Sequence, residues 1–230
     1  IENVQSIKRA SERVVDISTA ILQKHGYRVE EAITSASDFG VAQNRPRHFL
    51  VASKHFGPNL DEALKAFKVN KLTFDDISKC SFMQNDYSQF MLQNATLSEE
   101  NQARVDYLHD NDLFDLPNHQ RPECHRDGHT YPSVYGRIKG NQPLNTLTTG
   151  FGSPGRGRFI HPHERRVINM LEAARGQAFP DWYWKDAETL GLSRNSLYKI
   201  IGDAVPSLMV MPLIAALHKS FLSKELRAVG

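Results

Sequence analysis

Residues 27–53 read YRVEEAITSASDFGVAQNRPRHFLVAS, and they decide the fold class. Residues 27–34 alternate between apolar and polar side chains, while residues 47–52 are more continuously apolar, so both segments are predicted to be β-strands. Between them, residues 37–46 carry the Asp, Gly, Asn and Pro residues that are typical of a loop.

Upstream of this stretch, apolar residues recur at helical spacing, which predicts a helix over residues 6–24. Helices are also predicted over residues 60–67, 98–108 and 164–178. Helices that alternate with strands indicate an α/β sheet domain.

The 230 residues include 28 Lys and Arg against 26 Asp and Glu, and 40% are hydrophobic. These values exclude wholesale disorder, and the net charge of +2 neither implies nor excludes nucleic acid. Cys80 and Cys124 are too few for a disulfide framework, which suggests a reducing compartment. The apolar run 208–217 is too short to span a bilayer and contains Pro212. We therefore expect a soluble, cytoplasmic protein.

The sequence begins Ile-Glu-Asn-Val, without Met, inside what looks like a structured segment. We expect it to be a fragment, a processed product or the second piece of a split protein.

Two short motifs offer chemistry, and each also has a simpler interpretation. Glu2-Asn3-Val4 is a tripeptide that occurs often by chance and suits a strand end. In QNRPR (43–47) the proline stiffens the backbone, so Arg45 and Arg47 can present planar donors to an oxyanion or a carbonyl. Taken alone, the pentapeptide also fits a solvated basic turn.

Taken in order, the motifs resemble the C-terminal portion of the cytosine-C5 DNA methyltransferase family. The resemblance covers about residues 1–53 and 130–218, and no one of its motifs would be specific alone. Its segments are ENV (2–4), DFGVAQNRPRHFLVAS (38–53), GRFIHP (157–162), LEAARGQAFPDWY (171–183) and IGDAVP (201–206).

The resemblance implies an α/β fold with a partial Rossmann-like methyltransferase sheet and an irregular target recognition domain. Residues 1–53 would form the C-terminal part of the catalytic domain and residues 54–160 the target recognition domain. Residues 161–230 would supply helices that return to the catalytic domain.

The resemblance also implies the reaction. In this family a cysteine thiolate adds to C6 of a cytosine flipped out of duplex DNA, and C5 then takes a methyl group from S-adenosylmethionine. Glu2 would contact N3 and the exocyclic amine, and Arg47, with Arg45 beside it, would hold O2 and the phosphate of the flipped nucleotide. Negative charge that develops on the N3 and O2 side of the ring requires such groups.

The cofactor residues implied by the resemblance are Asn3, Asp203, Ala204 and Val205, and Asp203 stands where the family usually has Asn. The family's glycine-rich cofactor motif and its Pro-Cys nucleophile motif do not occur in this sequence, and neither cysteine is preceded by proline. We therefore expect the chain to be inactive alone and to need the N-terminal half of the methyltransferase, in the same polypeptide or in a second chain.

The recognition region contributes the candidate DNA contacts. Three kinds of residue suit DNA contact: those with hydroxyls, glycines that allow close backbone approach, and arginines that bind phosphates or bases. The candidates are Arg137, Thr146, Thr148, Thr149, Gly150, Gly152, Arg156, Arg158 and Arg165. For the threonines, ordinary β propensity is an equally good explanation.

Three alternatives remain open from the sequence. His119, Cys124, His125 and His129 suggest zinc, but their spacing matches no common finger, and we predict no metal. The chain could be a non-catalytic, sequence-specific DNA-binding module or a regulatory subunit. It could also keep the chemistry and act on RNA.

Overall fold

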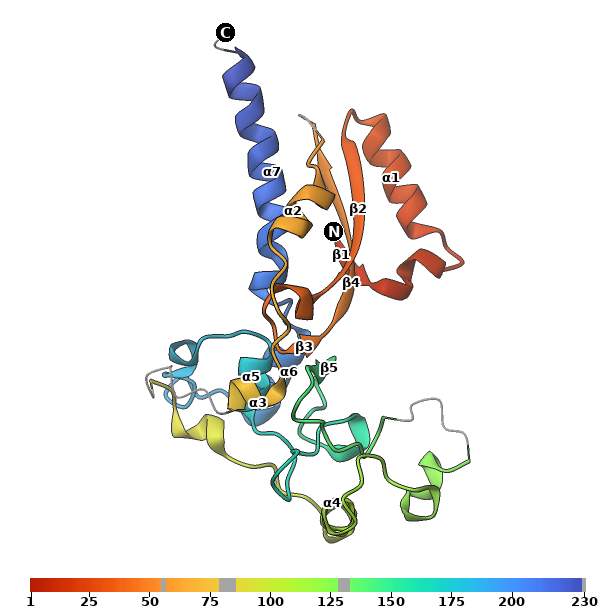
Figure 1. The fold of residues 1–230 in the computed structure, drawn as a ribbon, viewed down its shortest axis with the longest axis vertical. Coiled ribbons are helices and arrows are strands. Elements are labelled where there is room, and N and C mark those ends of the chain that lie inside the picture. Colours follow the sequence, from red (N-terminus) through yellow and green to blue (C-terminus); the bar gives the residue numbers. More distant parts are fainter. Residues whose placement is uncertain (55–56, 79–85, 128–132, 229–230) are drawn as a thin grey trace. The chain divides into compact units, whose positions relative to one another are not determined.

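The computed structural model describes residues 1–54, 57–78, 86–127 and 133–228, with side chains described up to residue 219 (Figure 1). The backbone forms two compact units. Unit 1 comprises Ile1–Lys71 and Val205–Gly230, and unit 2 comprises Leu72–Ala204. The three functional segments expected from the sequence, 1–53, 54–160 and 161–230, stay a prediction, since compactness alone does not test them.

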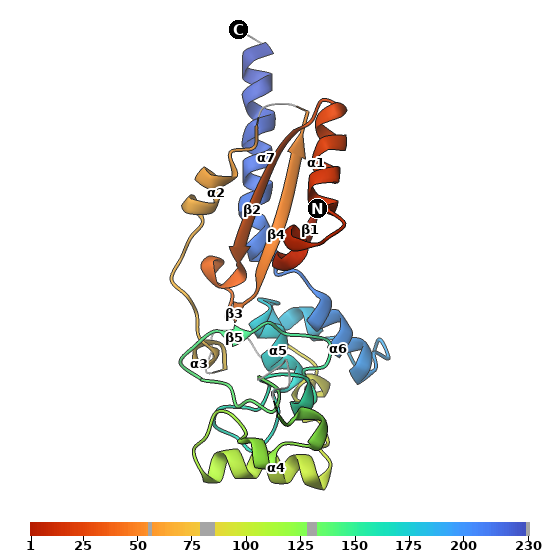
Figure 2. The ribbon, with the colours of Figure 1, turned by 90° about the vertical axis from the view of Figure 1, so that its right-hand side faces the viewer.

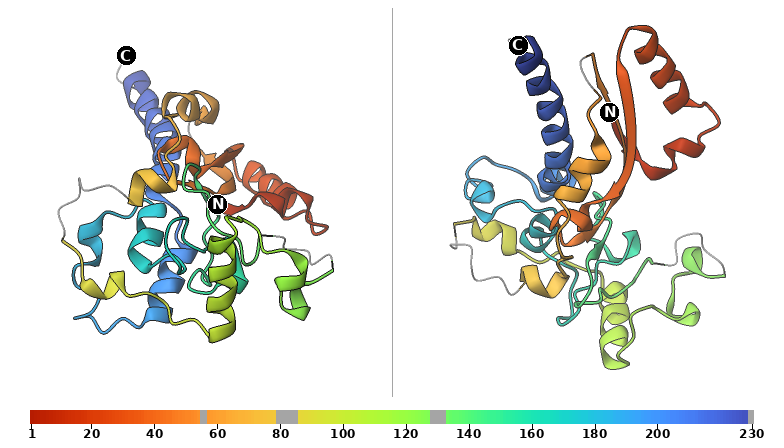
Figure 3. Two further views of the ribbon diagram at one scale, coloured as in Figure 1. Left: turned by 60° about the horizontal axis from the view of Figure 1, so that its bottom comes forward. Right: turned by 45° about the horizontal axis from the view of Figure 1, so that its top comes forward.

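Unit 1 is a three-stranded sheet with helices on both faces, in agreement with the expected α/β class (Figures 1 and 3). Its elements are β1 (Glu2–Val4), η1 (Gln5–Arg9), α1 (Val14–Lys24), β2 (Arg28–Ser35), η2 (Ala36–Phe39), β3 (Gln43–Asn44), β4 (Pro46–Ser53), α2 (Leu60–Ala66) and α7 (Ser207–Ala228).

The sheet order is β1-β4-β2, and both neighbours run antiparallel to β4 (Figure 2). The central strand buries His48, Phe49, Leu50 and Val51, which explains its continuous apolar pattern. Both predicted strands are confirmed: β2 is shifted by one residue from the predicted 27–34, and β4 is one residue longer at each end than the predicted 47–52. The short strand β3 falls within the predicted loop 37–46.

The helix predicted over residues 6–24 is shorter than expected. A 3₁₀ turn, η1, comes first, and α1 begins only at Val14, after Arg13 adopts a left-handed backbone with φ of 50°. A left-handed residue cannot continue a right-handed helix, so Arg13 separates the two elements. Val15 packs inward, whereas Ile17 and Ile21 are each 54% exposed.

Unit 2 consists of short helices joined by irregular segments (Figure 3). Its elements are α3 (Phe74–Ser78), η3 (Gln89–Leu92), α4 (Glu99–Asp110), η4 (Asn118–Gln120), η5 (Glu123–His125), β5 (Leu144–Asn145), η6 (Pro154–Arg156), α5 (Met170–Gly176), η7 (Asp181–Trp184) and α6 (Arg194–Asp203). One core of this unit includes Phe74, Phe151, Phe159 and Leu197. Another packs Val105 and Leu108 of α4 with Ile160 and Val167.

Helix α5 starts later than the predicted segment 164–178. Asn169 and Glu172 form a capping box, in which each side chain accepts a hydrogen bond from the other residue's backbone N–H. Before the cap the chain is extended, because Val167 bridges antiparallel to Ile160. The helical spacing of apolar residues over 164–168 therefore reflects a bridge and a cap rather than an earlier helical turn.

By length and composition alone, residues 194–219 could cross a membrane, since an 18-residue window within them has a mean hydropathy of 1.9. The backbone divides this stretch into α6, which ends at Asp203, and α7, which begins at Ser207. Buried side chains on both helices, such as Leu197 and Met209, give each a packing reason to be apolar.

Gly202, near the end of α6, lies close against the backbone of the segment that contains Thr148 and Thr149. A Cβ at this position would lie 2.5 Å from the Thr148 carbonyl carbon and from the Thr149 nitrogen. Backbone atoms cannot move aside as a flexible side chain can, so only glycine fits.

The variant Gly202→Ala is expected to destabilise unit 2 by about 1–3 kcal/mol, as overpacking does. Urea unfolding followed by circular dichroism measures this loss. The exposed Asn195→Ala on the same helix should change the free energy of unfolding by no more than about 0.5 kcal/mol. Equal stability of wild type and Gly202→Ala would show that Gly202 lies farther from the Thr148–Thr149 backbone than the structure places it.

Candidate active site and DNA-contact residues

Glu2 and Arg47 form an ion pair on one face of the sheet in unit 1. The register sets Glu2 opposite Phe49 and Val4 opposite Arg47, and directly opposed residues point to the same side. Arg47 Nε lies 2.8 Å from Glu2 Oε1. Both side chains are only partly exposed, Glu2 at 31% and Arg47 at 12%. The two residues assigned to the base are therefore in direct contact.

Arg47 is oriented by a second bond. Its Nη1 donates to the carbonyl of Pro46 at 2.8 Å, so its fork is held at two points. Arg45 lies two residues away and is 4% exposed, with Nη1 3.5 Å from Gln43 Oε1. The rigid QNRPR segment thus holds one arginine within the protein and the other at the sheet surface.

The cofactor candidates lie in both units. Asn3 alternates with Glu2 and is on the opposite sheet face, where its Oδ1 accepts a hydrogen bond from the Val4 N–H at 2.8 Å. Asp203 is exposed and its carboxylate lies 2.9 Å from Lys199 Nζ. Ala204 and Val205, which follow α6, are partly exposed. Asp203 therefore offers a carboxylate that a ligand ammonium could share with Lys199.

Six of the nine DNA-contact candidates lie in one loop of unit 2. Thr148 and Thr149 are exposed, and Thr146 is partly buried. The loop turns back on itself, because a Cβ at Gly150 would meet the Arg156 side chain at 2.8 Å. At Gly152, the other glycine among the candidates, a Cβ would lie 2.5 Å from the ring of Tyr198 in α6. Exposed hydroxyls beside the exposed Arg156 are a suitable set for phosphate contact.

The other three candidates, Arg137, Arg158 and Arg165, form ion pairs within unit 2. Arg137 donates to the Pro162 carbonyl at 2.7 and 2.9 Å and to Asp112 at 3.0 Å. Arg158 pairs with Asp115 and donates to the Phe114 carbonyl at 2.8 Å.

Arg165 is 50% exposed and lies 2.5 Å from Asp110, whose pKa is lowered by the hydrogen bond from that guanidinium. In all three cases an aspartate already balances the positive charge. These three arginines thus contribute to holding the segment 106–115, whatever else they bind.

A network that the sequence motifs did not bring out lies at the start of α5. Arg166 donates to Glu172 at 2.7 and 2.8 Å and to Glu164 at 2.8 and 2.9 Å. His161 Nδ1 accepts from the backbone N–H of Glu164 at 2.9 Å, and its Nε2 lies 3.4 Å from Glu172.

These contacts set the charge on Glu172. Burial alone would raise the pKa of this carboxyl, but the hydrogen bonds and charges of Arg166 and His161 outweigh burial and lower the pKa to about 2. The carboxylate therefore stays ionised in the folded protein. The spacing Asn-x-x-Glu at 169–172 is the sequence signal that could have identified Glu172.

His161, Glu164 and Glu172 bring ligand atoms within 4.8 Å of one another, as a metal site would. The Arg166 guanidinium already supplies the positive charge between the two carboxylates, so these residues suit an arginine rather than a metal ion.

The histidines considered for zinc pack against aromatic rings. His119 lies edge-on to Tyr107 at 6.3 Å and His125 to Tyr135 at 5.6 Å, while Cys124 is exposed. His129 and Cys80 fall outside the described residues.

The family model of the C-5 cytosine-specific DNA methylases matches residues 1–219. The chain belongs to this family. The resemblance found in the motifs is thereby confirmed, and so is the expectation of a DNA cytosine-5 methyltransferase sequence.

Two curated relatives carry type II restriction-modification names. The chain is 38% identical over 200 residues to "Type II methyltransferase M1.BsuMI" of Bacillus subtilis, covering 86% of this chain and 45% of that protein. It is 29% identical over 194 residues to "Type II methylase M.HgiDII" of Herpetosiphon aurantiacus, covering 80% and 54%. The chain thus spans about half the length of these relatives.

Solved structures show the same fold. The S. pombe Dnmt2 methyltransferase matches with a TM-score of 0.57 at 17% identity, covering 94% of this chain and 64% of that chain. The Entamoeba histolytica methyltransferase EhMeth matches with a TM-score of 0.56 at 13% identity, covering 96% and 62%. Together they confirm the α/β methyltransferase fold class.

The lowered pKa of Glu172 gives a stability prediction for the methylase chain. A glutamate ordinarily has a pKa of 4.5, and in the folded chain this carboxyl has a pKa of about 2. Its contribution to stability is therefore present above pH 4.5 and is lost as the pH falls through 2. The full contribution is on the order of 3 kcal/mol.

We expect Glu172→Gln to remove this part of the pH dependence and to lower stability at neutral pH, as measured by urea unfolding from pH 7 down to pH 2. Glu188→Gln, an exposed carboxyl in the same unit, is the control. A wild-type curve that matches the Glu172→Gln curve throughout would contradict the prediction.

Proposed function

We propose that this chain supplies the base-holding and DNA-recognition part of a DNA (cytosine-5-)-methyltransferase, which acts on a cytosine flipped out of duplex DNA. The observation that carries the proposal is the Glu2–Arg47 pair at 2.8 Å on one sheet face. Two side chains of opposite charge and complementary hydrogen-bonding character stand together at positions that match the family's base-contacting motifs.

The pair suits the electronic demand of the reaction. When a nucleophile adds to C6 of cytosine, electron density moves toward N3 and O2 of the ring. Glu2 would take up a proton from solvent as the base replaces Arg47 as its partner. The carboxyl can then donate that proton to N3, and the Arg47 fork can donate hydrogen bonds to O2. The Pro46 carbonyl holds the guanidinium in place before the base arrives, so less ordering is required during the reaction.

S-adenosylmethionine supplies the methyl group when bound. Within this chain the residues expected near it are Asn3, Asp203, Ala204 and Val205, and the exposed Asp203 carboxylate is the polar group best suited to an ammonium. The nucleophilic cysteine and the main cofactor motif of the family would come from the complementary N-terminal half.

The surface of unit 1 supports such a partner. Strand β1 lies at one edge of the sheet, and in the described part of the chain no strand of unit 1 pairs with its outer side. Ile1 beside it is 72% exposed, Ile17 of α1 is 54% exposed and Ile214 of α7 is 60% exposed. An open edge with exposed apolar residues on both flanking helices favours pairing with another protein segment.

The loop 146–156 would contact duplex DNA. We place the enzyme in the cytoplasm of a bacterial cell, the compartment that holds the DNA. Its relatives' names suggest restriction-modification as the setting.

We expect Glu2→Gln to reduce methyl transfer by about 100-fold or more, the usual contribution of a proton donor. The assay follows labelled methyl from S-adenosylmethionine into mixed-sequence duplex DNA, with the complementary half supplied. Glu12→Gln removes an exposed carboxylate from the same unit and should leave the rate unchanged.

DNA binding by the chain should survive in Glu2→Gln, which separates chemistry from binding. Full activity of Glu2→Gln would remove the proposed role of the pair. Binding to DNA without any transfer, despite assembly with the complementary half, would instead favour a non-catalytic DNA-binding module.

A further inference from the structure

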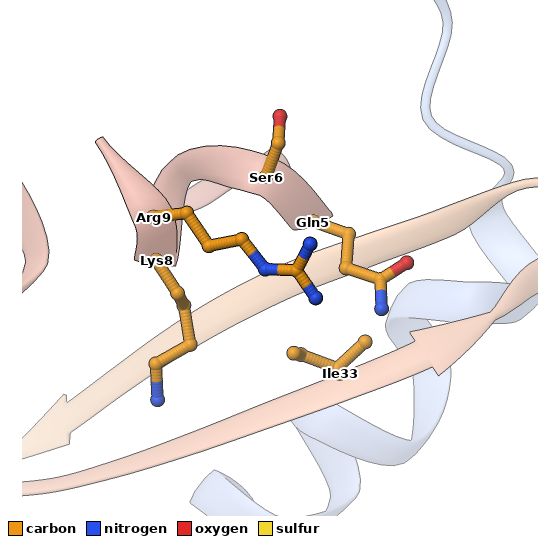
Figure 4. A pocket seen from close by; sticks show the side chains of 5 residues that line it. All are labelled: Gln5, Ser6, Lys8, Arg9 and Ile33. Carbon is orange, nitrogen blue, oxygen red and sulfur yellow. The ribbon is translucent and has the colours of Figure 1, made fainter.

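A hollow over η1 lies on the sheet face opposite the Glu2–Arg47 pair. Ile33 of β2 pairs with His48, and His48 alternates with Arg47 along β4, so the hollow and the pair lie on opposite faces. A residue that extends the proposed site is found in unit 2 instead, at the end of α5. The hollow is lined by Gln5, Ser6, Lys8, Arg9 and Ile33 (Figure 4).

Helix α6 ends without the left-handed residue that commonly closes a helix. Ala204 follows Asp203 with φ of −58° and ψ of 141°, an extended conformation. The last four carbonyls of a helix have no partner within it, and a buried one must be satisfied from elsewhere. Ile201 is fully buried, so its carbonyl has little access to water. The end of α6 therefore depends on a donor from another element.

The side chain of Gln177 supplies that donor. Its Nε2 lies 2.6 Å from the Ile201 carbonyl oxygen and 3.3 Å from the Ala204 carbonyl oxygen. Gln177 is only 1% exposed. The two carbonyls lie on either side of Asp203 in the chain. One amide group thus holds the backbone before and after the carboxylate that is proposed to meet the cofactor ammonium.

Gln177 is itself held at the end of α5. Its backbone N–H donates to the carbonyls of Ala173 and Ala174 at 3.1 and 3.0 Å. Both alanines are buried in the core of unit 2, and the helix begins with the capping box of Asn169 and Glu172. The donor to α6 therefore comes from an element that is anchored at both ends.

A second contact of Asp203 is weaker. Lys199 Nζ lies 2.9 Å from the Asp203 carboxylate, but the two side chains are 76% and 58% exposed. An exposed pair at this spacing stabilises a helix only slightly, whereas a buried carbonyl that loses its donor is strongly destabilising. Gln177 rather than Lys199 therefore determines where the Asp203 backbone lies.

We infer that Gln177 is a positioning residue for the cofactor. Through the Ile201 and Ala204 carbonyls it holds Asp203 where the carboxylate can meet the ammonium group of S-adenosylmethionine. Gln177 is buried and acts through the backbone rather than by touching the cofactor. The inference rests on the proposed function, since it takes S-adenosylmethionine as the ligand of Asp203.

The first measurement is amide hydrogen exchange of the chain alone, without cofactor. Gln177→Met keeps the length of the side chain and removes its donor. Amides of residues 200–204 should exchange about 10-fold faster in this variant, because an unsatisfied buried carbonyl favours local opening. Peptides from α4 should keep their wild-type exchange rates, since the opening is confined to the end of α6.

The second measurement uses the chain assembled with its complementary half. In Gln177→Met the KM for S-adenosylmethionine, and its Kd from equilibrium dialysis, should both rise about 10-fold, because only molecules with an ordered α6 end bind the cofactor well. The kcat at saturating cofactor should stay within about two-fold of wild type, because bound cofactor restores the order. A variant that is merely less folded would show a lower kcat and an unchanged KM.

Two further variants control for packing and for position. Gln177→Asn keeps the amide but is one methylene shorter, so it should raise KM by a smaller factor, and it replaces Gln177→Met if that variant does not fold. Gln89→Met makes the same replacement at an exposed glutamine of η3. It should leave the exchange rates, KM and kcat unchanged.

An unchanged KM and Kd in Gln177→Met, or an equal rise in Gln89→Met, would overturn the inference. Unchanged exchange at residues 200–204 would also overturn it, because other contacts would then fix the end of α6. If Asp203→Ala binds the cofactor as wild type does while methyl transfer continues, the inference fails and the proposed function stands. If the assembled wild type neither binds the cofactor nor transfers methyl groups, both fail.

Discussion

The antiparallel register of β1 against β4 is the constraint on which the candidate active site depends. Side chains alternate between faces along a strand, so a slip of one residue would move Glu2 to the opposite face from Arg47. The observed register places them 2.8 Å apart. Backbone hydrogen bonds hold this register, because Ile1 donates to the Leu50 carbonyl at 2.8 Å and the Leu50 N–H donates to the Ile1 carbonyl at 2.9 Å. Strand pairing in the sheet thereby determines the position of the chemical groups.

Unit 2 depends on a comparable linkage between packing and charge. Arg166 and Glu172 fix the start of α5, and Gln177 at its end donates a hydrogen bond to the Ile201 carbonyl of α6 at 2.6 Å. Gly202 then brings α6 against the backbone of the Thr148–Thr149 loop. The exposed threonines are therefore positioned by a continuous set of contacts from the α5 cap, through α6, to the loop. This gives the family motifs around residues 166–177 and 201–206 a structural role in the recognition region.

The sequence predicted β2 and β4, because residues 27–53 combine strand periodicity with clear loop punctuation, but it placed the short strand β3 in a loop. It placed the helices α2 and α4 closely but misjudged the starts of α1 and α5. In those two cases a left-handed residue, Arg13, and a capping asparagine, Asn169, overrode the apolar spacing. Such local backbone choices depend on tertiary contacts that a pattern does not contain.

For the site, the motif resemblance identified Glu2 and Arg47, which the structure brings into contact. The pairing of Arg137, Arg158 and Arg165 with aspartates was beyond the sequence, since the partners lie 25–55 residues away along the chain. The network around Glu172 was signalled only by its capping-box spacing. Long-range ion pairs of this kind can be identified only from coordinates, whereas strands can be predicted from the periodicity of the sequence.

The most direct measurement of the central claim is photocrosslinking with a duplex in which cytosines are replaced by 5-iodocytosine, followed by mass spectrometry of the crosslinked peptides. The chain is assembled with its complementary half so that the base can be extruded. The account predicts crosslinked peptides from residues 1–9 or 43–49, in addition to any from the recognition loop. Crosslinks confined to residues 72–204 would show that the Glu2–Arg47 pair does not meet the target base, and would contradict the account.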